Sequence, residues 1–403
     1  MSKKIFVRHQ QMKNDTLTET LRSINRGASC KRDVQSSTGL SWGAVSETVN
    51  LLLEKQIINF CEEIGKVPAG AGRRSSHFEF SRTGFLCIGM ELQRRQISTT
   101  LINMGGRIIG RNIKVLDGEL TAATLQQYVL AAFDAQLNQS QIAAEKVIAL
   151  SFSLTGAVDS FNKIWLQSSH VPEIRNYDFG KLAVDFPNLY HLSVEHDIFA
   201  KARAVLADKN WQDDNFVFMH IGGGVGMAIH NQNGFFFGSR GLAGEIGHIP
   251  VMNAPAGSKS RRCSCGQNNC LEIFLSDHGL LAFAGKKFNI KADNLPALFA
   301  AATTGQMNEF YRYLHPYLLQ TGITAANLFD PATIIIGGEL IEPWLPQLQE
   351  RLLPELQAAG WIHSPAQLKC YSMSSCNSAF GTVLNSIEPV ISLLAEKFQN
   401  SVL

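Results

Sequence analysis

One pattern of strands and helices occurs twice in the chain beyond residue 82, and this repeat limits the fold more than any other feature. The first copy contains three strands of a hairpin meander, a long amphipathic helix and an apolar strand, at residues 85–91, 96–103, 107–115, 120–137 and 146–154. After a strand and a helix at 189–194 and 198–206, the second copy begins with strands at residues 216–221, 226–230 and 234–237. This duplication predicts an α/β protein with two lobes.

Residues 1–82 have a separate pattern, which predicts a winged helix-turn-helix domain. Helical spacing of apolar residues predicts one helix at 15–25 and a short second helix at 31–38, which Gly39 ends. Ser41 caps a third helix, whose inward-facing residues are Val45, Val49, Leu52 and Leu53. Strands at 57–60 and 76–80 flank a loop rich in Gly, Lys and Arg, residues 62–75, which would form the wing.

The charge of this first segment favours DNA as its partner. Residues 1–80 hold twelve Lys and Arg against eight Asp and Glu, an excess of +4 in a chain whose net charge is +2. A basic excess that coincides with a wing is typical of DNA-binding domains, because phosphate contacts supply much of their affinity. The alternatives are a protein-docking module, a helical cap or a solvated surface hairpin.

The candidate DNA contacts lie in the N-terminal half of the third helix and in the wing. The first of these usually meets base edges, and the second suits a minor groove or phosphates. The helix candidates are Ser41, Trp42, Ala44, Ser46 and Glu47, with Thr48 and Asn50 as further polar candidates, and the wing candidates are Gly72, Arg73 and Arg74.

Three cysteines and a histidine are concentrated in one short segment. A Cys-x-Cys pair shortly before a third Cys lets one tight loop supply three ligands of a tetrahedral Cys₃His zinc site. The predicted ligands of one structural Zn²⁺ per chain are His248, Cys263, Cys265 and Cys270. Buried free thiols beside an ordinary histidine are the alternative. A disulfide fits less well, because eight cysteines without an apolar secretory segment are typical of a reducing cytoplasm.

The length of the chain, 403 residues, exceeds one ordinary core. We expect a winged helix-turn-helix at 1–82, a first α/β lobe at 83–195, a second lobe with the zinc site at 196–380 and a C-terminal helix at 381–403. The apolar face of that last helix must pack against another part of the protein, such as its own core. No apolar run approaches the roughly 18 residues of a membrane span, so we expect a cytoplasmic protein without such a span.

Six motifs, in this order, resemble the ROK family of repressors and sugar kinases. They are Gly156–Asp159, Glu195–Asp197, the glycine loop Ile221–Gly226, Gly244–His248, Cys263–Glu272 and Asp330–Gly338. With the N-terminal winged helix, the resemblance covers nearly the whole chain and points to the Mlc- and NagC-type repressors of sugar metabolism. It implies an actin-like, two-lobed sugar-kinase fold after the DNA-binding domain.

The resemblance also implies roles for individual residues. In ROK kinases a carboxylate just after the mid-chain strand is the general base for the sugar hydroxyl, and Asp197 matches it, although it could also cap the helix at 198–206. His248 would bind zinc through one ring nitrogen and sugar through the other. The implied ligand-binding set is Gly156, His196, Asp197, Glu245, His248 and Glu272.

Departures from the kinase pattern favour a regulator without catalytic residues. Where the kinases carry Asp-x-Gly-x-Thr, this chain has Glu91–Arg95, whose bulky side chains keep backbone amides from a phosphate. Gly223 replaces a usual threonine, and residues 168–172 replace a Pro-Asn pair that commonly contacts sugar. The alternatives are an ATP-dependent sugar kinase with an added DNA-binding domain, and a scaffold that does not bind DNA.

The predicted partners follow from this interpretation. A repressor of carbohydrate uptake or metabolism genes would bind double-stranded operator DNA and respond to a sugar, a sugar phosphate or a regulatory protein. A homodimer or homotetramer is expected, because a two-fold protein matches a pseudo-palindromic operator.

Overall fold

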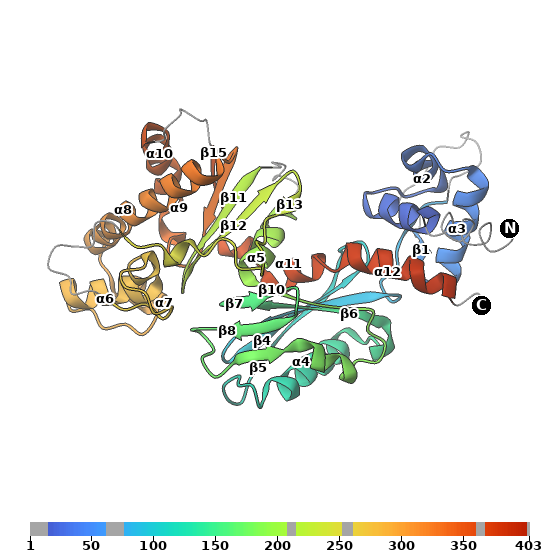
Figure 1. The fold of residues 1–403 in the computed structure, drawn as a ribbon, viewed down its shortest axis with the longest axis horizontal. Coiled ribbons are helices and arrows are strands. Elements are labelled where there is room, and N and C mark those ends of the chain that lie inside the picture. Colours follow the sequence, from blue (N-terminus) through green and yellow to red (C-terminus); the bar gives the residue numbers. More distant parts are fainter. Residues whose placement is uncertain (1–14, 62–75, 208–214, 252–260, 360–366, 401–403) are drawn as a thin grey trace. The chain divides into compact units, whose positions relative to one another are not determined.

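The computed structural model describes residues 15–61, 76–207, 215–251, 261–359 and 367–400 (Figure 1). The chain divides into two compact units. The first comprises Met1–Gly156, Asn162–Glu195 and Thr382–Leu403, and the second comprises Ala157–Phe161 and His196–Gly381. The division into four parts that the sequence suggests stays a prediction.

The first unit begins with three helices and a two-stranded antiparallel sheet. They are a helix over 15–25, α2 (Lys31–Thr38), α3 (Trp42–Glu54), β1 (Ile58–Phe60) and β2 (Phe78–Phe80). Gly39 ends α2 with a φ of 70°, and Ser41 caps α3 by accepting the N–H of Ala44 at 3.2 Å. Val45, Val49 and Leu52 are buried as predicted, whereas Leu53 is only half-buried.

A five-stranded sheet, in the order β10-β6-β3-β4-β5, forms the α/β part of the first unit. Strand β3 pairs antiparallel with β4 and parallel with β6, whose residues are all buried. Helix α4 packs on this sheet, where Thr99 donates a buried 2.7 Å hydrogen bond to Gln136. The elements are β3 (Leu86–Leu92), β4 (Gln96–Asn103), β5 (Ile108–Val115), α4 (Leu125–Ser140), η1 (Ala144–Lys146), β6 (Val147–Leu154), β8 (Ile164–Gln167), β9 (Arg175–Asp178), η2 (Phe179–Asp185) and β10 (His191–His196).

The second unit repeats this topology with the order β13-β12-β11-β14-β15. Strand β11 pairs antiparallel with β12 and parallel with β14, and both β11 and β14 are fully buried, as central strands covered on two faces are. Its elements are β7 (Ala157–Asp159), α5 (Asp197–Leu206), β11 (Phe216–Ile221), β12 (Val225–Asn231), β13 (Gly234–Phe235), η3 (Ile246–His248), η4 (Leu271–Ile273), α6 (Asp277–Phe288), α7 (Leu295–Ala301), α8 (Thr304–Phe329), β14 (Thr333–Gly337), η5 (Glu342–Trp344), α9 (Leu345–Gln347), η6 (Leu348–Leu352), α10 (Leu353–Ala359), β15 (Gln367–Cys370) and η7 (Met373–Ser375). The duplication predicted from the sequence is therefore present.

The single C-terminal helix predicted at 381–403 is wrong in one respect, because two helices, α11 (Ser378–Leu384) and α12 (Ile387–Asn400), replace it. Between them the Ser386 hydroxyl turns inward and forms a hydrogen bond with Ser151 of β6. Within the first unit, α12 also contacts the 15–25 helix, through an ion pair between Glu388 and Arg22.

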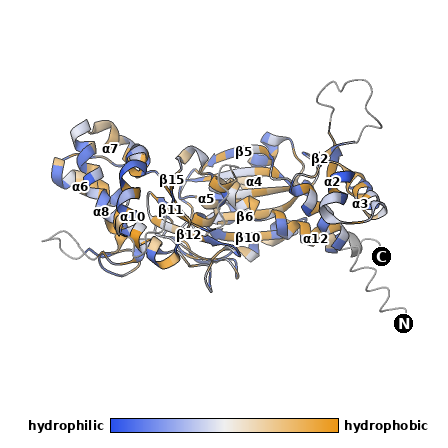
Figure 2. Ribbon diagram, turned by 90° about the horizontal axis from the view of Figure 1, so that it is seen from above, coloured by the Kyte–Doolittle hydropathy of each residue, from blue (hydrophilic) through white to orange (hydrophobic). Residues whose placement is uncertain are grey.

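Helix α12 has an apolar face that belongs to the core of the first unit. Val390, Ile391, Leu394 and Ala395 are at most 2% exposed, and Figure 2 shows apolar and polar residues alternating along the helix. The window Ser378–Lys397 is long and apolar enough for a membrane span by length and composition alone, but 61% of it is buried. Such burial is that of a core helix.

Candidate functional site

The predicted DNA-reading residues on α3 are mostly accessible. Trp42 is 53% exposed, Ser41 and Glu47 are exposed, and Ala44 and Ser46 are half-buried. Thr48 is 9% exposed and faces the core, so its place among the polar candidates is wrong.

A lysine from α2 fixes the polar face of α3. Lys31 Nζ donates to Ser46 Oγ at 2.9 Å and to Asn50 Oδ1 at 3.0 Å. These contacts hold the two helices of the helix-turn-helix together. The wing candidates Gly72, Arg73 and Arg74 lie outside the described residues.

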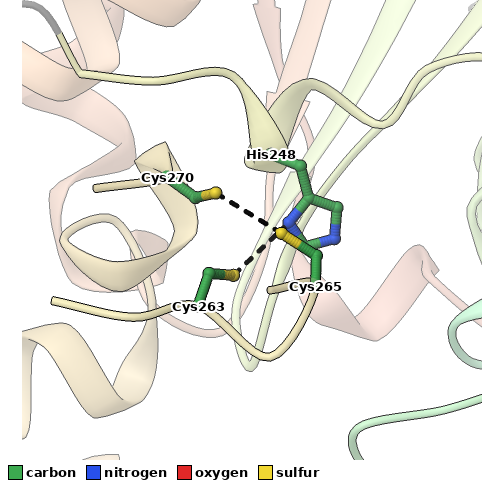
Figure 3. Close-up of side chains that lie close together, drawn as sticks. All are labelled: His248, Cys263, Cys265 and Cys270. Atoms are coloured by element: carbon green, nitrogen blue, oxygen red, sulfur yellow. Dashed lines mark hydrogen bonds between the residues drawn. The ribbon is translucent and has the colours of Figure 1, made fainter. Parts of the chain in front are cut away.

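The four predicted metal ligands meet in the second unit (Figure 3). His248 ends η3, Cys263 and Cys265 lie in the next described loop, and Cys270 immediately precedes η4. Gly266, with a φ of 93°, turns this loop and donates its N–H to the carbonyl of Cys263 at 3.0 Å. A tight turn between two bridged segments thus directs three thiols toward one imidazole.

The distances within this cluster fit a tetrahedral metal ion. Cys265 Sγ and Cys270 Sγ are 3.6 Å apart, as are Cys263 Sγ and His248 Nδ1, and all four ligand atoms lie within 4.8 Å of one another. Bonds of about 2.0–2.3 Å to tetrahedral zinc place neighbouring ligand atoms about 3.5–3.8 Å apart. The cluster could therefore hold a zinc ion.

The second ring nitrogen of His248 faces the predicted sugar ligands. Its Nε2 lies 3.7 Å from Glu245 Oε2, while Glu245 Oε1 lies 3.9 Å from His196 Nε2. Glu272 Oε2 accepts the backbone N–H of Val225 at 3.3 Å, beside the glycine loop. The structure thus brings two imidazoles and a carboxylate together next to the metal cluster, and carboxylates and imidazoles suit sugar hydroxyls, which both donate and accept hydrogen bonds.

Gly156 is a separate case, because it lies in the first unit. Its φ is 83°, and a Cβ there would lie 2.5 Å from the carbonyl oxygen of Gln167. A close backbone approach explains the glycine without a ligand.

Asp197 is buried and paired. Its Oδ2 lies 2.6 Å from Lys201 Nζ, one turn along α5, and its Oδ1 lies 3.2 Å from His196 Nδ1. Burial disfavours the charged carboxylate, but the Lys201 ammonium outweighs burial and holds the pKa of Asp197 well below its ordinary value. The suggestion that Asp197 caps α5 is wrong, since His196 Nδ1 accepts the N–H of Ile198 and is the cap.

Three further polar residues were not selected from the sequence. His220 Nε2 lies 3.0 Å from Glu339 Oε2, and His220 Nδ1 lies 2.7 Å from the Tyr371 hydroxyl. They lie in or just after the carboxyl ends of β11, β14 and β15, respectively. These three strands are parallel neighbours in the second sheet. The sequence alone did not provide the strand order, and without that order His220, Glu339 and Tyr371 could not be grouped.

A glycine positions the turn that carries Glu245 and His248. Gly244 has a φ of 95°, and a Cβ there would lie 1.8 Å from the carbonyl oxygen of Met227. Gly234 has a similar φ of 94° but nothing within 4 Å of its Cβ position.

Gly244→Ala is therefore expected to destabilise the second unit well beyond Gly234→Ala. The control introduces only the backbone strain of a left-handed residue, about 1 kcal/mol, whereas Gly244→Ala adds a clash with backbone that must move. Urea unfolding of the two variants measures the difference. Equal losses would show that the close approach at Gly244 is unimportant.

Comparisons with known proteins give one consistent result. A protein-family model described as "ROK family" matches residues 87–382. The DNA-binding transcriptional dual regulator NagC of Escherichia coli (strain K12) is 28% identical over 324 residues, which cover 77% of this chain and 76% of that protein. The xylose repressor of Bacillus subtilis (strain 168) is 25% identical over 316 residues, which cover 76% of this chain and 77% of that protein.

Solved structures confirm the predicted fold. A ROK family transcriptional regulator, a homolog of the E. coli MLC protein, matches with a TM-score of 0.74 at 19% identity, covering 95% of this chain and 98% of that one. A ROK hexokinase from Thermus thermophilus matches with a TM-score of 0.60 at 16% identity, covering 76% of this chain and 100% of that one. Repressors and kinases thus share this fold, and the site must decide between them.

Proposed function

Since the chain belongs to the ROK family, we propose that a sugar bound in its second unit sets the affinity of its winged helix-turn-helix for operator DNA. The chain is a ROK-family transcriptional repressor of sugar-metabolism genes, in keeping with relatives described as an N-acetylglucosamine repressor and a xylose repressor. The observation that carries the proposal for the site is the cluster of Glu245, His196 and the Nε2 of His248. A sugar ring with several hydroxyls satisfies such a mixed set of donors and acceptors.

The metal cluster would hold one residue of this site, His248, in place. Bound zinc would fix the loop 263–270 and hold the imidazole of His248 in one orientation. With Nδ1 directed at the cluster, His248 presents Nε2 beside Glu245 to a sugar hydroxyl. Glu272, two residues after Cys270, holds the backbone of the glycine loop and offers a further carboxylate.

The DNA-binding part of the proposal rests on α3. Trp42 is more than half exposed at its N-terminal end, and Lys31 fixes Ser46 and Asn50 on the polar face. Two copies of this helix in a homodimer or homotetramer would read the two halves of a pseudo-palindromic operator in the cytoplasm. A sugar changes operator affinity only if it binds the competent and incompetent arrangements unequally.

A sugar kinase is the second candidate, favoured by the place of Asp197 at the start of α5 and by the fold shared with a hexokinase. The pairing of Asp197 with Lys201 argues against it. A general base works best with a pKa near the operating pH. The pKa of Asp197 is instead lowered, further from neutral pH. The proposed protein is therefore a sensor without catalysis, in which Asp197 accepts a hydrogen bond from sugar without removing a proton.

Operator binding should depend steeply on salt and respond to a sugar. With six or more phosphate contacts, affinity falls by about 10³-fold or more between 50 and 200 mM salt, and a sugar effector typically changes it by about 5–150-fold. Fluorescence anisotropy on a DNA fragment selected from random sequence measures both, with a panel of free and phosphorylated sugars. Glu245→Gln should lose the response to sugar, whereas Glu350→Gln, which removes an exposed charge elsewhere in the same unit, should keep it.

Several results would contradict the proposal. Salt-insensitive DNA binding would favour the scaffold interpretation, and ATP-dependent phosphorylation of a sugar, lost in Asp197→Asn, would favour the kinase. Operator binding that no sugar or sugar phosphate changes would point to a regulatory protein as effector.

A further inference from the structure

The carboxyl ends of β11, β14 and β15 converge at one edge of the second sheet. These strands are parallel neighbours, and the glycine loop Gly222–Gly224 directly follows β11. Ligands of α/β sheets bind outside the carboxyl ends of parallel strands, and glycine-rich loops there bring backbone amides close to phosphates. This edge is therefore where a nucleotide's phosphates would be expected to lie.

A carboxylate of the chain itself occupies that place. Gly338, with a φ of 130°, packs so closely on β11 that a Cβ there would lie 2.2 Å from the Ile221 carbonyl oxygen. The next residue, Glu339, directs Oε2 onto Gly222, where it would lie 2.2 Å from an added Cβ. The space beside Gly222 is thus filled by the carboxylate of Glu339 from the same chain.

Two neighbours keep Glu339 charged and in position. His220 Nε2 lies 3.0 Å from its carboxylate, and the Tyr371 hydroxyl fixes the other nitrogen of His220. The Glu339 side chain is 48% exposed, so only partial burial opposes the charge, and His220 and Lys201 lower its pKa to about 2. The carboxylate is therefore ionised throughout the physiological pH range.

The loop itself is also engaged internally. The N–H of Gly222 donates to the carbonyl of Gly224 at 3.0 Å, and the N–H of Val225 donates to Glu272 at 3.3 Å. Asp277, whose backbone N–H donates to Gly222, adds another carboxyl group, and its pKa is raised to about 6 by burial and by Glu339. A phosphate entering here would meet the carboxylates of Glu339 and Glu272 beside the loop, and like charges repel.

We propose that Glu339 is a specificity residue, which excludes nucleotides by placing its own carboxylate where their phosphates would bind the glycine loop. The sensor is thereby insensitive to cellular ATP, whichever sugar or protein is its effector. This inference does not depend on the identity of the effector.

Removal of the carboxylate tests the idea by a gain of binding. Calorimetry with inorganic pyrophosphate, and with the ATP analogue AMPPNP plus Mg²⁺, compares the wild type with Glu339→Gln and Glu339→Gly in the full chain. Each variant should bind pyrophosphate, AMPPNP or both more tightly than the wild type does, by about tenfold or more, because a repulsive charge is lost. Glu339→Gln keeps the shape of the side chain, so the test stands even if the glycine variant fails to fold.

The matched control is Glu342→Gln, three residues further on, whose carboxylate accepts the N–H of Met373 at 3.1 Å. It lowers the local charge equally and should give no gain. The proposal is overturned if the wild type already binds AMPPNP or pyrophosphate as tightly as the Glu339 variants, or if Glu342→Gln gives the same gain. Loss or absence of a sugar response in the operator assay would instead count against the proposed function alone.

Discussion

Replacement of Cys270 by serine should remove the metal ion from the protein and abolish its response to sugar. Cys270 Sγ is fully buried, 3.6 Å from Cys265 Sγ, and a serine hydroxyl is not a thiolate that zinc prefers. Metal binding stabilises the folded state by about 4 kcal/mol when the free metal exceeds its dissociation constant a thousandfold. We expect a loss of that order in the free energy of unfolding of the second unit.

Metal analysis and urea unfolding measure this effect. Cys370→Ser is the matched control, because Cys370 is a half-buried thiol in the same unit whose Sγ lies 3.7 Å from the carbonyl of Leu345, outside the cluster. The control should keep one metal ion per chain. A metal-free wild type, or equal losses in the two variants, would contradict the assignment.

A second comparison separates the metal from the sugar. His248→Ala should lose both metal and sugar binding, since its two ring nitrogens face the cluster and Glu245 respectively. Glu245→Gln should lose sugar binding while the metal content stays at one per chain. If His248→Ala kept full sugar binding, the shared role of this imidazole would be wrong.

The sequence predicted those parts of the structure that local pattern determines. The end of α2 was predicted to the residue because Gly39 provides a stop, and the start of α3 was predicted because Ser41 provides a cap. The cysteine cluster was predicted because ligand spacing in a tight loop is itself local. The N-terminal helices, the strands of the first sheet and the first three strands of the second sheet, β11 to β13, also followed from periodicity.

What the sequence did not provide depends on contacts between distant segments. The break between α11 and α12 could not be predicted from an apolar run, because it lies where Ser386 contacts Ser151, 235 residues away. The burial of Thr48 follows from packing against the rest of the domain. Glu339 needed the order of the strands, since only the parallel pairing of β11 with β14 brings it onto Gly222.

Lys201→Met should destabilise the second unit about as strongly as any single change in it. The side chains of Lys201 and Asp197 are 14% and 10% exposed, and breaking a buried pair from one side costs about 3–5 kcal/mol because a buried charge is left uncompensated. The double variant Lys201→Met/Asp197→Asn should recover much of this loss, because it removes the stranded charge as well.

Lys287→Met is the matched control. Lys287 pairs with Glu309 at a similar distance, 2.5 Å, but its side chain is 46% exposed, so water takes the place of the lost partner. Urea unfolding of the single variants and the double variant gives the coupling between Lys201 and Asp197. Equal losses for the two lysine variants, or no recovery in the double variant, would contradict a stabilising buried pair.

The pH dependence of this loss tests what Asp197 does. Its folded pKa lies below the unfolded value, so the pair contributes stability that is present at neutral pH and disappears as pH falls through the folded pKa. Burial is already the largest single influence on this carboxyl group, and without Lys201 much less opposes it. The pKa of Asp197 should therefore rise, and the variant should recover relative to wild type as acid protonates the carboxyl group. A carboxylate that Lys201 holds ionised accepts a hydrogen bond from a sugar hydroxyl well but takes its proton poorly. The same ion pair that stabilises the second unit therefore favours sensing over phosphoryl transfer at this site.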